Sequence, residues 1–212
     1  MKSDERVVEV VAPIGGYSRI VVTAPCGLAG QTGLIGALDD PVCFYEPGRL
    51  EAGLLWFHSG YVEYLVDGGM PDGAAPVALE VSVEICSDAP AYNERWPSDV
   101  TLWINDREVG TWTCPGDFGG RRAHLTPDWW SVEDTQYGLL KRWRVDAGGT
   151  FLDDAALSPV TVHDLALASG MIPVRLGVKA DASHVGGVNL FGHTFGNHPQ
   201  DLVLRVAYAA RG

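Results

Sequence analysis

The chain has 212 residues, 46% of them hydrophobic, and a formal net charge of −12 at pH 7. A surface this acidic repels nucleic-acid phosphates and anionic lipid, so we expect no direct contact with nucleic acid and none with a membrane. No apolar stretch approaches the roughly 20 residues that a membrane-spanning helix needs. The charged start at residues 1–6 is unlike a signal peptide. These features predict a soluble, cytoplasmic protein.

Strands dominate the first half of the chain, because apolar and polar side chains alternate and helical periodicity is nearly absent. The first four strands are expected at residues 7–11, 19–23, 53–66 and 77–86. Gly60 lies inside the third and predicts a bulge or bend there. The fourth alternates cleanly, and the apolar side chains on one of its faces are Leu79, Val81, Val83 and Ile85.

The second half of the chain continues the same pattern. A hairpin is expected at residues 100–113, where Asn105-Asp106 supplies the turn. Further strands are expected at residues 137–145, 160–165, 174–179 and 201–208, and short helical turns near residues 47–53 and 128–134. The total of about nine or ten strands is what a jelly roll needs. We predict one domain over residues 1–212, an all-β, jelly-roll-like antiparallel β-sandwich.

Long loops connect several of these strands, at residues 87–99, 114–136 and 180–200. Loops of this length in a compact domain are usually either functional or disordered. These contain Trp, Phe, Tyr and Arg, which disordered segments avoid. We therefore expect ordered loops that take part in the function.

The polar face of the strand at residues 77–86 offers a first candidate site. If this strand and the strand carrying Trp103 are neighbours, Trp103 joins Glu84 and Ser82 on one surface. An aromatic ring beside carboxylates is suited to a sugar, because the ring stacks on C–H groups while the polar atoms bind hydroxyls. The alternative is a solvated outer face that covers one tryptophan.

The loop at residues 114–136 and its borders offer a second candidate site, rich in aromatic and arginine side chains. Arg121 or Arg122 could form a bidentate contact with a carboxylate. That carboxylate could belong to a ligand, to Asp117 or to Glu84. The alternative is a loop held by an Arg–Asp pair, with the tryptophans as a satellite of the core. The aromatic members of this group are Trp112, Phe118, Trp129, Trp130 and Tyr137.

Motifs for metals, cofactors and nucleophilic catalysis are absent. The four cysteines form no CxxC pair, and buried reduced thiols are expected. The histidines have no metal-binding spacing. A weak signal for a structural calcium comes from Asp88, Asn93 and Asp99, and no other cofactor is expected. Paired carboxylates for glycoside hydrolysis would be chosen from Glu63, Glu84, Asp99 and Asp117, as in any acidic β-protein.

Several segments resemble a C-terminal domain carried by a group of bacterial ArsR-type winged-helix transcriptional regulators. They are residues 26–29, 52–57, 59–64, 84–93, 96–99, 110–113, 115–122, 136–138 and 189–192. The resemblance implies a ligand-sensing or accessory β-sandwich linked to transcription regulation. No basic recognition helix precedes Val7, so a DNA-binding role is not implied for this chain. The hairpin at residues 102–112 is also similar to that of galactose-binding-type carbohydrate modules.

Three functional hypotheses follow. The first is a non-catalytic domain that binds or senses a small molecule, a sugar by its chemistry, through Glu84, Tyr92, Trp96, Asp99, Trp103, Trp112, Asp117, Arg121, Trp130 and Gln136. The second is a small enzyme (a cyclase, isomerase or glycoside-active enzyme), with Glu84 or Asp117 as acid or base and Arg121 stabilising negative charge. The third is a structural module such as a homodimer, with the aromatic loops between subunits.

Overall fold

Two long strands organise the fold of the computed structural model, which describes residues 5–209. Strand β3 (Ala52–Asp67) pairs through its first part with β11 (Val188–Phe191) and through its second part with β10 (Met171–Val178). Strand β4 (Ala75–Cys86) pairs with β12 (Leu202–Ala209) and, near its end, with β11. The short β11 therefore lies between the two long strands and pairs with both.

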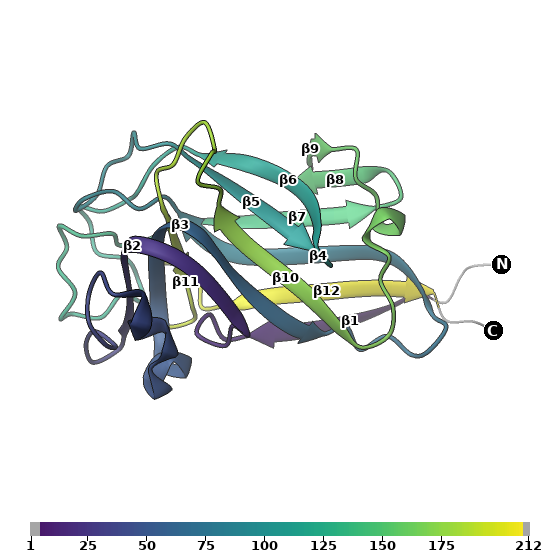
Figure 1. Ribbon diagram of the computed structural model, residues 1–212, viewed down its shortest axis with the longest axis horizontal. Coiled ribbons are helices and arrows are strands. Elements are labelled where there is room, and N and C mark those ends of the chain that lie inside the picture. Colours follow the sequence, from purple (N-terminus) through teal and green to yellow (C-terminus); the bar gives the residue numbers. More distant parts are fainter. Residues whose placement is uncertain (1–4, 210–212) are drawn as a thin grey trace.

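The other strands extend this arrangement into two layers (Figure 1). One layer continues from β3 and β10 into β5 (Ser98–Ile104) and β6 (Arg107–Cys114), with β2 (Arg19–Gly30) on the free side of β3. The other continues from β4 into β7 (Leu139–Asp146), β8 (Gly149–Leu152) and β9 (Ala155–Ser158). Strand β1 (Glu5–Ala12) pairs with β12. All these pairings are antiparallel, which confirms the predicted all-β sandwich.

The core fills the space between the layers with side chains from alternate strand positions. The four apolar residues predicted to share one face of β4 are all 0% exposed. Tyr64 and Trp143 are among the largest fully buried side chains. The Tyr64 hydroxyl donates to the carbonyl oxygen of Ile14 over 2.7 Å, which satisfies its polar end inside the core.

Local turn chemistry explains where two strands bend or reverse. Asn105 and Asp106 adopt φ values of +49° and +60°, which close the β5–β6 hairpin as predicted. Gly60 has φ of +106°, and a Cβ there would overlap the carbonyl oxygen of Val21 on β2. The bend in β3 therefore requires glycine at this position.

Four expectations about local structure differ from what the structure contains. Residues 128–134 form turns and bends and no helix. Residues 160–165 are not a strand but include a 3₁₀ helix, η3 (Val162–Leu165), whose first turn is held by Asp164 accepting from the Thr161 backbone and hydroxyl. Strand β11 lies inside the segment expected to be a loop, and β8 and β9 were not expected. The helical turn near residues 47–53 is confirmed as η2 (Pro47–Glu51), which follows η1 (Pro41–Tyr45).

Candidate functional site

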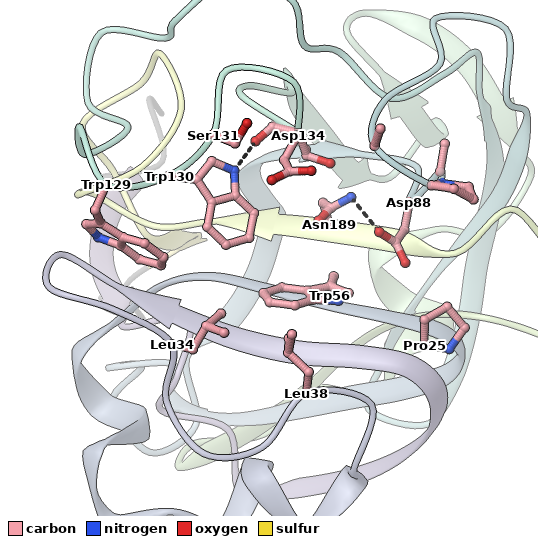
Figure 2. A pocket seen from close by; sticks show the side chains of 14 residues that line it. Pro25, Leu34, Leu38, Trp56, Asp88, Trp129, Trp130, Ser131, Asp134 and Asn189 are labelled. Carbon is pink, nitrogen blue, oxygen red and sulfur yellow. Dashed lines mark hydrogen bonds between the residues drawn. The ribbon is translucent and has the colours of Figure 1, made fainter.

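A pocket of about 530 Å³ lies where the long loops meet the ends of β2, β3 and β11 (Figure 2). We call it the tryptophan pocket. Three tryptophans line it, Trp56 from β3 and the consecutive Trp129 and Trp130 from the loop before β7. The other residues on which the argument depends are Leu34, Leu38, Asp88, Asp134, Thr135 and Asn189.

The aromatic wall is a packed cluster and not a set of separate rings. The Trp130 ring contacts Trp129 and Trp56 edge to face, with ring centroids 5.4 Å and 5.8 Å apart, and it also contacts Phe195 at 5.9 Å. Gly27 faces Trp56 across the β2–β3 pair, and a Cβ there would overlap the indole. A glycine on β2 thus leaves the space that the pocket's most buried indole occupies.

Hydrogen bonds fix the orientation of the two loop tryptophans. The Trp129 Nε1 donates to the carbonyl oxygen of Gln31 over 2.8 Å, and the Trp130 Nε1 donates to that of Thr135 over 2.8 Å. Because their only polar atoms are already bonded to the backbone, these side chains offer a ligand their apolar ring faces. Such faces suit the C–H groups of a sugar ring or another flat apolar surface.

Polar groups occupy the side of the pocket that faces Trp56 (Figure 2). Asn189 donates from Nδ2 to the Ser87 carbonyl oxygen over 2.7 Å and reaches Asp88 Oδ1 over 3.4 Å. Burial, followed by the negative charge of nearby Asp117, raises the pKa of Asp88 to about 8. Burial also raises the pKa of Asp134. At neutral pH this side of the pocket therefore holds at least one carboxyl group that keeps its proton.

Asp117 lies behind the pocket and ties two parts of its wall together. It is 0% exposed, and its Oδ2 accepts from the Ala89 N–H over 2.9 Å and from the Thr135 hydroxyl over 2.8 Å. The Cys86 thiol donates to Oδ1 over 3.7 Å. Burial raises the pKa of Asp117 to about 7 in spite of these hydrogen bonds. Asp117 therefore positions the wall without being among the lining residues.

Two other residues predicted to bind ligand are also 0% exposed and support the loops. The Gln136 Nε2 donates to the carbonyl oxygens of Ser131 over 2.6 Å and Asp134 over 3.3 Å, which shapes the wall beside Trp130. Glu84 accepts backbone N–H groups from Gly138, Asn197 and His198. Burial raises the pKa of Glu84, while these hydrogen bonds lower it.

The first predicted grouping, Trp103 with Glu84 and Ser82, does not form. It required β4 and β5 to be neighbours, but β11, β3 and β10 lie between them in the sheet order. Trp103 pairs across strands with Arg175 and lines a separate surface groove. Ser82 and Glu84 are buried, and on the neighbouring strand β7 they lie opposite Arg142 and Leu140.

The remaining predicted residues lie away from the tryptophan pocket. Within residues 5–209, Arg121 contacts no carboxylate and instead stacks on Tyr137, with its Cζ 4.0 Å from the ring centroid. Lys141 lies over Trp112 at 4.8 Å. Asp99 accepts from Thr113 and His184, and these bonds lower its pKa against the opposing effect of burial.

Tyr92 and Trp96 belong to the loop after β4, and neither is among the residues that line the tryptophan pocket. Trp96 is 37% exposed and donates from Nε1 to the Gly186 carbonyl oxygen over 3.1 Å. The Tyr92 ring lies against Gly119 and Gly120, where a Cβ would overlap it. Trp130 is therefore the one predicted ligand-binding residue that the structure places in the wall of this pocket.

Five important lining residues were not predicted from the sequence to bind a ligand. Trp129 could have been found, because it precedes Trp130 in the loop that was singled out. Trp56 was hidden in an apolar strand, where tryptophan indicates core. Asp88, Asp134 and Asn189 carry no motif, and only the pairing of β11 with β3 and β4 places Asn189 beside the loop after β4.

Metal-binding groups are not assembled in the part of the chain that the structure describes. Within residues 5–209, no group of three or more His, Cys, Asp or Glu side chains could hold a metal ion. The residues weighed for calcium are engaged separately. Asn93 Oδ1 accepts from the Arg95 N–H, and Asp99 binds His184, whereas Asp88 lines the pocket. All four cysteines are free and buried.

Helices long and apolar enough to cross a membrane are absent from residues 5–209.

Comparisons with known proteins identify no family for this chain. No family model matches the chain, and no curated protein matches it. A carbohydrate-binding module CBM36, solved in complex with calcium and xylotriose, is 12% identical with a TM-score of 0.38, over 95% of this chain and 98% of that one. The CBM36-1 domain of a xylanase from the hindgut metagenome of Trinervitermes trinervoides is 13% identical with a TM-score of 0.33, over 99% of both chains.

A third solved structure is much longer than this chain. It is a Paenibacillus cycloisomaltooligosaccharide glucanotransferase complexed with cycloisomaltoheptaose, 10% identical with a TM-score of 0.39, over 89% of this chain and 18% of that one. All three TM-scores are below 0.5, so these likenesses carry no argument and we transfer no ligand from them. The resemblance to the ArsR-type regulators finds no support in these comparisons.

Proposed function

We propose that the chain binds a small sugar-like molecule in the tryptophan pocket and leaves it chemically unchanged. One observation carries the proposal: three indole rings, two of them with their N–H groups bonded to backbone, line a cavity opposite a row of carboxyl and amide groups. Apolar faces opposite a few polar groups are the general composition of a small-molecule site, and about 530 Å³ lies within the usual size range.

The sugar is inferred from this chemistry. Stacking on a ring satisfies the C–H face of a pyranose, while the side-chain oxygens of Asp88, Asp134 and Asn189 can accept its hydroxyl protons. A sensing role, of the kind that the resemblance to transcription regulators implies, would use the same pocket for its effector. We further propose that the chain is a single domain, since β1 and β12 pair from Glu5 with Ala209 to Ala12 with Leu202.

Replacing Trp129 by alanine should weaken sugar binding by about 1–3 kcal/mol, because a stacking surface at the pocket's rim is lost. Trp129 is 39% exposed, so its truncation should leave the fold intact. Trp96 is the matched control: it is 37% exposed and also donates its indole N–H to a backbone carbonyl, but it does not line the pocket. Titration calorimetry with the tightest sugar from a thermal-shift screen measures both variants. If Trp96→Ala loses affinity and Trp129→Ala does not, the site is in the loop at residues 87–99 instead.

An enzyme remains the second candidate, and it is favoured by the largely buried carboxyl group of Asp88 in the pocket wall, whose pKa burial raises to about 8. A carboxyl group that is protonated near pH 7 in an apolar pocket can act as a general acid. Glu84, Asp117 and Arg121, the residues expected to act in an enzyme, do not line this pocket. Proton NMR of a bound sugar over a day distinguishes the two functions, because an enzyme consumes it and a binding domain returns it unchanged.

A further inference from the structure

The charge of the pocket lining is one-sided. Its fourteen residues include three tryptophans and two aspartates, and none of them is Lys, Arg or His. Arg122 is a basic residue hydrogen-bonded to the backbone of the wall. Its guanidinium donates to the carbonyl oxygens of Pro127 and Trp130, and it does not line the pocket. The pocket thus supplies no positive charge of its own to a ligand.

The two carboxyl groups have few partners inside the protein. Within residues 5–209, the hydrogen bond that reaches the Asp88 carboxylate is the 3.4 Å contact from Asn189. In the same range no hydrogen bond or ion pair reaches the carboxylate of Asp134. Carboxyl groups taken out of water normally gain a cation or several N–H donors. Asp88, which is largely buried, and Asp134, which is partly buried, both lack such partners, and both line the pocket, where a ligand could reach them.

We propose that the ligand carries a positively charged nitrogen, as in a sugar with a free amine, an inference that rests on the proposed function of this pocket. Trp56, Trp129 and Trp130 would attract such a cation through their ring faces, which are electron-rich. Asp88 and Asp134 would supply the counter-charge, and Figure 2 shows both on the side of the pocket opposite Trp56. The net charge of −12 would also favour the approach of a cation over long range.

A positively charged ligand explains why two carboxyl groups without basic partners line the same pocket. A neutral ligand would leave the buried Asp88 carboxyl group protonated and without a charged partner. The negative charges of Asp117 and Asp39 add to the effect of burial and raise the pKa of Asp88. The charge of Glu133 raises the pKa of Asp134 in the same way. An ammonium group would be the first opposite charge in this environment, so it should lower the pKa of these carboxyl groups and release protons on binding.

The test compares ligands matched in shape. Glucosamine is titrated against glucose and N-acetylglucosamine, and choline against its neutral tert-butyl analogue, by calorimetry at pH 7. We expect each cation to bind at least about tenfold more tightly than its neutral counterpart, and Asp88→Asn to remove that advantage. The two pairs also separate the sources of the charge, since an amino-sugar site prefers glucosamine to choline. Binding of a cation should release protons, so its measured binding enthalpy should differ between two buffers of different ionisation enthalpy.

Asp134→Asn is the second variant, which keeps the proposal testable if Asp88→Asn fails to fold. Asp128→Asn is the control, because the Asp128 side chain is fully exposed beside Arg122 and does not line the pocket. If neutral sugars bind as tightly as the amines, this inference is overturned while the proposed binding function stands. If none of the probes binds and no sugar in a wider screen does, both are overturned.

Discussion

Replacing Glu84 by alanine should lower the free energy of unfolding by about 4 kcal/mol or more, a large part of the stability of an ordinary domain. The side chain has no exposed surface, and its two oxygens accept N–H groups from Gly138, Asn197 and His198 over 2.8–3.0 Å. A buried donor left without a partner costs about 1–3 kcal/mol, which applies in full to Gly138 and in part to the half-buried Asn197 and His198. Urea denaturation followed by tryptophan fluorescence measures the change.

The matched control for this prediction is Glu108→Ala. Glu108 pairs with Lys179 on the surface, where both side chains are well exposed, and such pairs contribute at most about 1 kcal/mol. Gly196 gives an independent check on the Glu84 cradle. A Cβ there would overlap the Glu84 carboxylate, and φ is +80°, so Gly196→Ala should also destabilise the protein. Equal stability losses in Glu84→Ala and Glu108→Ala would show that the three backbone hydrogen bonds contribute little.

Features set by neighbouring residues were predictable from the sequence. The alternation in β4 identified four core side chains, all of them buried, because side chains of a strand point to opposite faces in turn. Asn105-Asp106 identified the hairpin, because both residues tolerate positive φ. Asp164 three residues after Thr161 is a cap signature, so η3 could have been recognised as helical instead of extended.

Features set by distant parts of the chain were not predictable. The order of strands in a sheet depends on which apolar faces pack together, and no local pattern shows that β11, β3 and β10 lie between β4 and β5. The grouping of Trp103 with Glu84 failed for this reason. Asn189 and Asp88 meet in the pocket across a separation of 101 residues. Their meeting depends on the pairing of β11, a strand of four residues inside a loop-like sequence.

The candidate site illustrates how composition can locate a region without assigning roles. The aromatic loop at residues 114–136 was recognised, and Trp130 does line the pocket. Asp117 and Gln136 from the same region were expected to touch ligand, yet both are fully buried and bind the backbone of the wall. A polar residue between aromatic ones is equally compatible with both roles, and burial decides between them.

Stability should fall as the pH rises from about 4 to about 8, and Asp88 should be a main cause. Burial raises the pKa of Asp88 to about 8 and that of Asp117 to about 7, whereas carboxyl groups of the unfolded chain titrate near 3.8. Between these values the folded protein holds more protons than the unfolded chain. The free energy of unfolding must then decrease with pH, by up to about 1.4 kcal/mol per pH unit for each fully shifted group.

Asp88→Asn tests this assignment, because the amide keeps the side chain's shape and cannot ionise. We expect the variant to lose part of the slope between pH 5 and 8 and to be more stable than the parent at pH 9. Asp99 and Asp164 have lowered pKa values, so their contributions are lost only below about pH 4, outside this range. Asp128→Asn, on an exposed side chain, should leave the slope unchanged. Urea denaturation at each pH measures the three proteins, and parallel curves for Asp88→Asn and the parent would mean that Asp88 is already ionised in the empty pocket at neutral pH.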